Sequence, residues 1–495
     1  MLYTRPSLLA PIFILLLYIC LSLYRRYAYQ RKMRREGCQP IPKYPHTDPF
    51  LGLDHRRVML EGTKRGEVGA TRAKIHAKCG HTYEYNVFGQ RTVCTMNMDN
   101  IRTVVGPSSA NFVKPPGSKQ AAHPLLTDNL VALDGHEWKQ SRSLVMPVLT
   151  KEQAVDLPAL ERHIQKLLKL IPRDGSTVDL QPLFQRLFID RATEFVLGDS
   201  TNTLDPDEEA HPEADKFLTM FEDVMRMLGQ RVQAGHLLFL RGRDVQWHQD
   251  IATIFATVDG FIDKAAARQH SASPRFSLVE HYVDEINDKA AVRSQLMSVF
   301  FGSRDQISIS MSLLMFALAR HPEVWLKLRR EVLAQPLGPS TESTSRLPYT
   351  RNVVYEGLRI FSPVLMSRRQ CDADCILPSG GGKDGQAPIL IPRGAIVEMN
   401  IQGLHRDRTI WGESADEFLP ERWTDRTPGW KYIPFLAGKR VCPARDLSVT
   451  QMIYLLARLV QEFELLQNRD PVLELVDDIR NVRLSRRVQV ALIPP

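Results

Sequence analysis

The residue whose type and neighbours most clearly indicate a chemical role is Cys442, in the stretch FLAGKRVCPARD at positions 435–446. A cysteine thiolate is a strong, soft ligand for iron, provided that it is kept unprotonated and hydrogen-bonded. Gly438 precedes it by four residues, and glycine lets a loop place several backbone N–H groups around a sulfur. An apolar helical pattern follows, and the N-terminal end of a helix stabilises negative charge. The stretch therefore predicts an iron-ligating thiolate, with a buried structural cysteine as the alternative.

Charged residues that could take part in chemistry lie in two further stretches. In YEGLRIF, Glu356 and Arg359 are three residues apart, so they share one face of a helix and can form an ion pair. In FFGSRDQIS, positions 300–308, Asp305 is an acid within an apolar helical pattern, which is uncommon for a residue without a role. A solvated surface pair and a plain amphipathic helix are the respective alternatives.

Together these stretches resemble the cytochrome P450 superfamily. FLAGKRVC is similar to the family's haem-binding loop, Phe-x-x-Gly-x-Arg-x-Cys-x-Gly; Phe435, Gly438, Arg440 and Cys442 match it, and Ala444 stands in place of its last glycine. The resemblance implies that Cys442 is the axial ligand of the iron in haem b and that the other three matching residues contact the cofactor.

Two sets of charged residues acquire roles from the same resemblance. FLPERW is similar to the family's Pro-Glu-Arg-Phe segment, which implies a buried structural triad of Glu356, Arg359 and Arg422 behind the haem. The segments DGHEWKQSR and LHRDRTIWG resemble motifs that lie near the haem propionates, and arginine is suited to bidentate carboxylate binding. The implied contacts to the cofactor, in addition to Arg440, are Trp138, Arg142, His405 and Arg406.

The FFGSRDQIS stretch is similar to the family's Ala/Gly-Gly-x-Asp/Glu-Thr-Thr segment, which lies over the oxygen site. Gly302 and Asp305 match it, whereas Ser303 replaces a glycine and Gln306 replaces a threonine. A threonine hydroxyl donates, accepts and holds water, so glutamine is a poorer proton relay. Ser303 lies three residues earlier on the same face and could compensate. The expected catalytic groups are therefore Asp305, Gln306 and Ser303.

The substrate pocket is expected to be apolar. Its candidates are the following residues of the central helix and of the segment after the Glu-x-x-Arg helix, together with part of 107–130: Met297, Phe300, Phe301, Val364, Leu365 and Met366. Ordinary core packing is the alternative for each of them. A long aliphatic, fatty-acid-like, polyketide or terpenoid substrate suits such a lining.

The segments PKYPHTDPFLGLD, NLVALDGHEWKQSRSLVMP and LPSGGGKDGQAPILIPRG resemble the fungal branch that includes alkane and fatty-acid hydroxylases. This implies a monomeric monooxygenase of fungal secondary metabolism that uses O2 and takes electrons from NADPH through a cytochrome P450 reductase. Lys439 and Arg445 are candidates for docking the reductase, with a solvated pair as the alternative.

Two other functions stay open, the first of them because Gln306 replaces the threonine. One is a haem-thiolate isomerase or dehydratase that does not use O2. The other is a haem-binding sensor or electron carrier without enzymatic activity. Reductase-dependent oxygen uptake distinguishes the first, and the response of the iron to carbon monoxide distinguishes the second.

The elements that must position these residues are mostly helices. Apolar residues at three- and four-residue steps predict helices over 152–171, 179–198 and 442–463, another that opens at Pro322, and a long central helix over 284–320. Extended patterns predict strands in 82–96, 371–400 and 481–493, with SGGGKDG as a hairpin turn. The expected fold is mainly α with small β-sheets, the cytochrome P450 fold, preceded by one transmembrane helix.

The charge distribution argues for a membrane and against nucleic acid. Seven of the eight net positive charges lie in residues 1–43, so the rest of the chain is nearly neutral and lacks a footprint for phosphate backbones. These charges follow an apolar run that predicts an uncleaved anchor over 7–24, with a cytosolic body at the endoplasmic reticulum. A basic, proline-rich linker is expected over 25–54, and a catalytic domain over 55–495.

Overall fold

The computed structural model describes residues 9–150, 155–205, 212–241, 244–267, 276–471, 479–480, 483–484 and 488–495. Its α-helices are α1 (Leu9–Arg35), α2 (Leu53–Arg65), α3 (Val68–Cys79), α4 (Met98–Val105), α5 (Pro116–Ala122), α6 (Gly135–Leu149), α8 (Leu157–Leu170), α9 (Leu180–Leu197), α10 (Pro212–Ala234), α11 (Val245–Ala267), α12 (Leu278–Glu285), α13 (Lys289–Ser303), α14 (Asp305–Leu318), α15 (Pro322–Leu333), α16 (Thr341–Ser345), α17 (Pro348–Ile360), α18 (Ile401–His405), α19 (Arg408–Trp411) and α20 (Arg445–Glu462). The short 3-10 helices are η1 (Ser109–Asn111), η3 (Gly235–Arg241), η4 (Glu413–Asp416), η5 (Pro420–Trp423) and η6 (Gly438–Arg440). The strands are β1 (Thr82–Val87), β2 (Gln90–Thr95), β3 (Phe112–Val113), β4 (Val178–Asp179), β5 (Met366–Cys371), β6 (Cys375–Gly381), β7 (Ala387–Ile391), β8 (Ile396–Asn400), β9 (Leu465–Asn468), β10 (Ile479–Arg480), β11 (Arg483–Leu484) and β12 (Gln489–Ile493).

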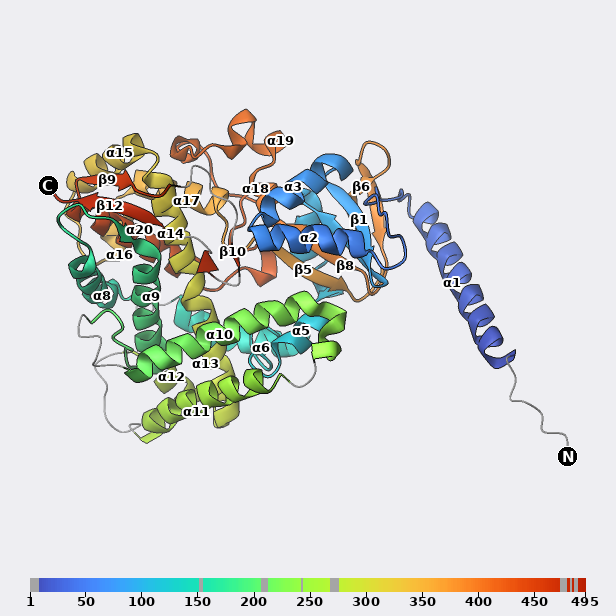
Figure 1. Ribbon diagram of the computed structural model, residues 1–495, viewed down its shortest axis with the longest axis horizontal. Helices are drawn as coiled ribbons and strands as arrows, with labels where there is room; N and C mark the ends of the chain where they lie inside the picture. The colour runs from blue at the N-terminus through green and yellow to red at the C-terminus, as the bar shows by residue number, and fades with distance from the viewer. Residues whose placement is uncertain are drawn as a thin grey trace.

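Helices make up most of the body, and the strands form small sheets at its two ends, as the sequence predicts. Figure 1 shows α8, α9, α14 and α20 on the side of the C-terminus, and β1, β5, β8, α2 and α3 on the side towards α1. The larger sheet has the order β1-β2-β8-β5-β3, in which only β2 and β8 run parallel among the described strands. A three-stranded sheet of β4, β12 and β9 lies at the other end.

The strand predictions are confirmed where the structure describes the residues. β1 and β2 form a hairpin with its turn at Phe88 and Gly89, both of which have positive φ. β6 and β7 form a second hairpin, and the SGGGKDG segment makes its turn with Gly380, Gly382 and Gly385 in the positive-φ region that glycine favours. The predicted C-terminal strand is present as β12, although part of 481–493 lies outside the described residues.

The single central helix predicted over 284–320 is wrong, because the chain is broken twice in this range. Asp288 caps α13 by accepting a hydrogen bond from the Ala290 N–H, which separates α13 from α12. Arg304 (φ −98°, ψ −65°) interrupts the helix between Ser303 and Asp305. Asp305 is thereby placed in the first turn of α14, where the helix dipole favours a carboxylate.

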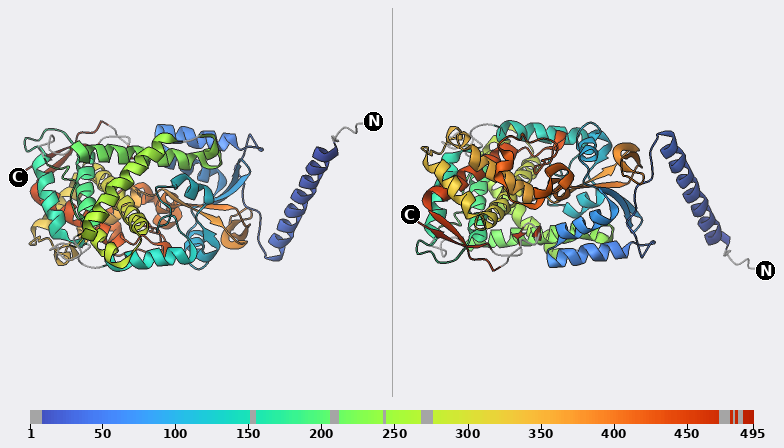
Figure 2. Two further views of the ribbon diagram at one scale, coloured as in Figure 1. Left: turned by 90° about the horizontal axis from the view of Figure 1, so that it is seen from below. Right: turned by 90° about the horizontal axis from the view of Figure 1, so that it is seen from above.

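The other helix predictions are confirmed as α8, α9, α15 and α20, although residues 151–154 lie outside the described part. These helices bury one apolar cluster around α14, whose side chains are enclosed on all sides by α8, α9, α17 and α20. A second cluster lies between α10, α11, α12 and α13. The two clusters hold α13 and α14 in the middle of the helical part (Figure 2).

Helix α1 stands out from the body (Figures 1 and 2). Near its C-terminal end it contacts the β6–β7 hairpin: the Tyr29 hydroxyl donates to the Leu390 carbonyl at 3.0 Å, and Lys32 pairs with Asp374 at 2.7 Å. Because α1 continues to Arg35, no helix end marks the boundary expected between residues 24 and 25. Among the described residues, no helix meets both the length and the hydropathy needed to cross a bilayer.

The segment expected to be a spacer is partly packed onto the body. Cys38 and Ile41 are buried, and Lys43 forms a parallel bridge with Glu84 in β1. The Gln39 N–H also donates to the Pro388 carbonyl at 2.9 Å. Residues 38–44 therefore extend the sheet side of the body instead of spanning solvent.

Candidate active site

The chain around Cys442 forms a closed loop. The Cys442 N–H donates to the Phe435 carbonyl at 2.9 Å, which joins the two ends of the predicted ligand loop. Gly438 has a φ of +65°, and a Cβ at this position would overlap the Val105 carbonyl oxygen at the end of α4. Glycine is therefore required for the loop to lie directly against α4.

The sulfur of Cys442 faces groups that stabilise negative charge. The Ala444 N–H donates to it, and α20 begins at Arg445 with its positive end behind the cysteine. Burial raises the pKa of the thiol, whereas the Ala444 N–H and the guanidinium groups of Arg142 and Arg445 oppose this shift. A bound metal ion removes the thiol proton outright. Alanine in place of the family's last glycine still supplies the backbone donor.

Three of the residues predicted to contact the cofactor lie together beside this loop: Trp138, Arg142 and Arg440. The Arg440 guanidinium lies 4.0 Å from the centroid of the Trp138 ring, and the Arg142 guanidinium lies 5.5 Å from it. Arg142 donates to the Val441 carbonyl at 3.1 Å, which ties α6 to the cysteine loop. Arg440 pairs with Asp134 at 2.6 Å.

Two further cations that the motifs did not indicate belong to the same cluster. Burial, followed by the charges of Arg369 and Arg440, lowers the pKa of Lys114 to about 7. Burial and Arg440 lower the pKa of Arg369 to about 10. Asp134 is the carboxylate that opposes these shifts. The cluster therefore holds more buried positive charge than its own carboxylate neutralises.

The excess positive charge of this cluster bears on whether the chain can bind a haem. A porphyrin with two propionates needs a metal ligand on one axis and cations for its carboxylates. Cys442 provides the ligand, and the cations are Arg369, which is buried, and Arg142, Arg440 and Lys114, which are partly buried. Because two added carboxylates would relieve the unfavourable burial of these cations, the donor set fits the cofactor.

Glu356, Arg359 and Arg422 form the buried cluster that the sequence predicts. Arg359 donates to Glu356 through Nε at 2.9 Å and Nη2 at 2.8 Å, and the Arg422 Nε donates to it at 3.4 Å. Trp423, which the motif analysis did not single out, donates its indole N–H to Glu356 at 2.9 Å. The two guanidinium groups also donate to five backbone carbonyls, those of His405, Ala415, Glu417, Trp411 and Ser414. The cluster thereby fastens α17 to the segment from 405 to 423.

His405 and Arg406 belong to this segment and do not join the cations near Cys442. The His405 side chain has no exposed surface, and its Nε2 accepts a hydrogen bond from the Ile433 N–H at 2.9 Å. Burial, together with the charge of Arg359, lowers its pKa to about 3, so the ring is neutral. Arg406 donates to the Ile360 carbonyl at 3.0 Å and pairs with Asp416 at 3.4 Å. No hydrogen bond or ion pair joins these two residues to the cations near Cys442 in the described part of the chain, and their role in binding propionates stays a prediction.

The expected catalytic groups flank the break between α13 and α14. Asp305 is buried, and its Oδ1 lies 3.1 Å from the Nε of Arg304. The Ser303 hydroxyl donates to the Phe300 carbonyl at 3.2 Å. The Oε1 of Gln306 is buried without a hydrogen-bond partner in the described part of the chain.

The predicted pocket residues divide into two groups. Met297 and Phe300 are buried in the apolar cluster between α10 and α13, with exposed fractions of 1% and 3%, so they are core residues with no surface for a ligand. The remaining four are partly exposed, and none of them borders either of the two cavities described below: Phe301, Val364, Leu365 and Met366.

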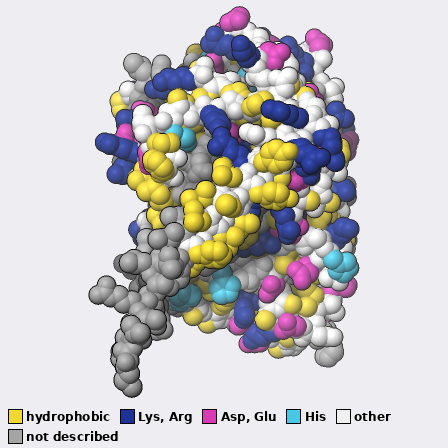
Figure 3. All heavy atoms as spheres, turned by 90° about the vertical axis from the view of Figure 1, so that its right-hand side faces the viewer, with side chains coloured by type: hydrophobic (Ala, Val, Ile, Leu, Met, Phe, Trp, Pro, Cys, Tyr) yellow, Lys and Arg dark blue, Asp and Glu magenta, His cyan; other side chains and the backbone are white. Residues whose placement is uncertain are grey.

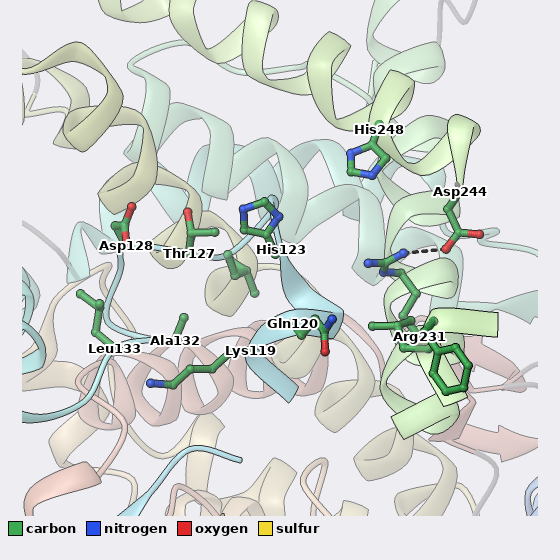
Figure 4. A pocket seen from close by; sticks show the side chains of 13 residues that line it. Lys119, Gln120, His123, Thr127, Asp128, Ala132, Leu133, Arg231, Asp244 and His248 are labelled. Atoms are coloured by element: carbon green, nitrogen blue, oxygen red, sulfur yellow. Dashed lines mark hydrogen bonds and ion pairs between the residues drawn. The ribbon is translucent and has the colours of Figure 1, made fainter. Parts of the chain in front are cut away.

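A cavity of about 640 Å³ lies between α5, the end of α10, η3 and the start of α11 (Figure 4). Lys119, Gln120, His123, Leu126, Thr127 and Asp128 contribute to it. The assignment of part of 107–130 to the substrate pocket stays a prediction. On the opposite element, Arg231 pairs with Asp244 at 2.6 Å. A second cavity, of about 740 Å³, lies beside the cysteine loop and is bordered by Phe435, Val441 and Arg445.

Lys439 and Arg445, the expected docking residues, are exposed. Arg445 pairs with its neighbour Asp446 at 2.9 Å. Both therefore lie on the surface near the cysteine loop.

A mainly helical body with a cysteine loop before a long helix, a buried Glu-x-x-Arg cluster and a surplus of cations beside the sulfur defines a haem-thiolate protein. The chain belongs to the cytochrome P450 family, whose model matches residues 57–488. It is therefore a cytochrome P450 monooxygenase, and its family implies a haem-thiolate iron as cofactor.

Several fungal proteins are similar to it over most of their length. The cytochrome P450 monooxygenase apdE of Emericella nidulans is 33% identical over 457 residues, which cover 90% of this chain and 86% of the relative. The monooxygenase himC of Aspergillus japonicus is also 33% identical, over 92% of this chain and 84% of the relative. The monooxygenase iccC of Talaromyces variabilis is 33% identical over 92% of both chains.

Proposed function

We propose that this enzyme hydroxylates an apolar small molecule with O2, using haem b and electrons that a reductase takes from NADPH. The observation that carries the proposal is the Cys442 sulfur, which receives a backbone N–H and lies beside partly or fully buried cations that have too few carboxylate partners. When bound, the haem iron supplies the activation of oxygen. Arg142, Arg440, Lys114 and Arg369 bind the two propionates, while the Glu356 cluster holds the adjoining segment rigid.

Asp305 is the proposed proton donor. Its carboxylate is held at the break of the central helix, and Gln306 follows it directly with an unused acceptor atom. An amide can order a water molecule by accepting and donating hydrogen bonds, although it cannot pass on a proton as a hydroxyl does. Proton delivery is therefore assigned to Asp305 and water, with Gln306 holding the water.

The proposed substrate is a long aliphatic, fatty-acid-like, polyketide or terpenoid compound of fungal secondary metabolism. The support for it is the apolar character and partial exposure of Phe301, Val364, Leu365 and Met366, and the fungal origin of the similar monooxygenases. Apolar side chains bind such compounds mainly through burial of surface and add little directional selectivity.

The direct test uses the purified full chain with a cytochrome P450 reductase and NADPH. Oxygen consumption that depends on both the reductase and an extracted apolar metabolite, with the appearance of a product heavier by one oxygen atom, supports the proposal. Conversion of a substrate without oxygen uptake would instead support an isomerase or dehydratase. Reduced iron that does not bind carbon monoxide would support a sensor or electron carrier.

Replacing Gln306 by threonine is expected to maintain or increase the fraction of NADPH that ends in product, because the hydroxyl restores a proton relay. The matched variant Gln306→Leu, which has similar volume but no polar atoms, is expected to lower this fraction about tenfold, since it removes the groups that hold water. Both are measured as product and hydrogen peroxide formed per NADPH consumed. A collapse of coupling in the threonine variant would show that the amide has a specific role of its own.

We propose further that the chain is a monomer attached to the endoplasmic reticulum through α1, with its body in the cytosol. Exposed apolar side chains cover α1, including Phe13, Ile14 and Leu23, and Figure 3 shows apolar side chains bordered by Lys and Arg on this face of the molecule. Deletion of residues 1–24 is expected to release the protein from carbonate-washed microsomes, where the full chain should stay in the pellet. A full chain that carbonate releases completely would contradict the attachment.

A further inference from the structure

Arg304 is a buried cation at the point where the central helix breaks. Its exposed fraction is 2%, and its guanidinium pairs with two carboxylates: Nη2 lies 3.3 Å from Glu222 Oε1, and Nε lies 3.1 Å from Asp305 Oδ1. A buried guanidinium without counter-charges is strongly unfavourable, so these two carboxylates determine where it lies.

Through these two ion pairs, Arg304 joins α10 to α14. Glu222 belongs to α10, which crosses the body over α13 in Figure 1 and borders the cavity of Figure 4 at its far end through Arg231. Asp305 begins α14. The guanidinium also lies 5.0 Å from the centroid of the Phe221 ring, and Phe221 packs edge-on against Phe300 of α13 at 5.2 Å. Arg304 therefore lies at the centre of the contact between α10 and the break.

We propose that Arg304 is a positioning residue, which holds the Asp305 carboxylate in place and makes that position depend on the seating of α10. The inference rests on the proposed function, in which Asp305 donates a proton. The Arg304–Asp305 contact is a close ion pair between two buried groups, and removal of one partner leaves the other charge buried and uncompensated. Nε and Nη1 of Arg304 have no hydrogen-bond partner in the described structure, so the guanidinium keeps donors for Asp305 if that side chain rotates.

Three variants separate the two contacts. Arg304→Gln removes both and is expected to lower product per NADPH about tenfold, with a matching rise in hydrogen peroxide and little change in KM. It is also expected to speed amide hydrogen exchange in the middle of α10 about tenfold, since α10 loses a charged contact. Glu222→Gln removes the contact to α10 alone, so exchange should rise while coupling falls less. Arg304→Lys keeps the charge and should recover most of the coupling.

The matched control is Arg293→Gln. Arg293 lies on α13, pairs with Asp259 of α11 at 2.6 Å and lies over the Phe255 ring at 4.8 Å. Because it is eleven residues before the break, its loss should speed exchange in α11 and leave coupling unchanged.

Unchanged coupling in Arg304→Gln would overturn the inference, whether or not exchange in α10 increases. Equal loss of coupling in Arg293→Gln would also overturn it, because the effect would then be general loosening of the helices. Hydrogen exchange does not depend on turnover. If the parent enzyme itself formed no product from O2, the proposed function would fail, and a specific effect of Arg304 on α10 would still be visible.

Discussion

Replacement of Cys442 by serine is expected to abolish the characteristic absorption of the reduced carbon-monoxide complex and to reduce reductase-dependent turnover below detection. A thiolate donates electron density to iron, which favours cleavage of the O–O bond, whereas a serine hydroxyl stays protonated and is a weak iron ligand. The buried cations beside the loop remain in this variant, so some porphyrin is still expected to bind. The measurement is the difference spectrum of the dithionite-reduced protein with and without carbon monoxide.

The control for this variant is Cys79→Ser. Cys79 is partly buried, as Cys442 is, and lies at the end of α3. The Cys79→Ser substitution should leave both the carbon-monoxide spectrum and the turnover as they are in the parent. If the Cys442 variant kept the parent's pigment and the same carbon-monoxide spectrum, the assignment of the thiolate, and with it the proposed function, would be wrong.

Replacement of Glu356 by glutamine is expected to destabilise the protein by about 3–5 kcal/mol, which is the usual cost of breaking a buried ion pair from one side. The change leaves the guanidinium groups of Arg359 and Arg422 buried without their carboxylate, and it weakens hydrogen bonds from Trp423 and the Leu419 N–H. Because folded proteins are stable by only about 5–15 kcal/mol, much of the variant should fail to fold. Urea unfolding followed by tryptophan fluorescence measures the loss.

Glu421→Gln is the matched control, since it changes a carboxylate in the same segment. Glu421 pairs with Lys327 at 2.6 Å, but both side chains are more than two-fifths exposed. An exposed pair of this kind contributes about 0–1 kcal/mol, so the control should unfold close to the parent. A similar loss of unfolding free energy in both variants would mean that the Glu356 cluster does not stabilise the fold in the way that its contacts indicate.

Much of the candidate site follows from short patterns, because each pattern describes a local structure. The run from Phe435 to Cys442 predicts a glycine-dependent loop, and the structure closes it with hydrogen bonds between near neighbours. Glu356 and Arg359 lie one helical turn apart, so their pairing needs only a helix. The hairpins and the helices after Pro322 and Cys442 are likewise set by turn residues and apolar spacing.

The remaining parts of the site come from segments that are distant in the chain. Lys114 and Arg369 join Arg440 although more than 70 residues separate each from the next, and neither lies in a motif that sequence alone distinguishes from a surface cation. His405 is of a residue type that can bind a carboxylate. The fold, however, buries its ring, and its Nε2 accepts a hydrogen bond from the Ile433 N–H. Met297 and Phe300 have the apolar character of a pocket, but packing against α10 places them in the core.

The sequence by itself predicted a candidate iron ligand and determined the helical class of the body and the acid at the centre of the chain, since these depend on residue type and on spacing within one or two turns. Only the tertiary structure decided which cations surround the thiolate, where the central helix breaks and which carboxylates hold Arg304. The physical reason is that burial and charge pairing act between segments that meet only when the chain is folded. The residues next to a side chain in the sequence therefore do not identify its partners in the folded protein.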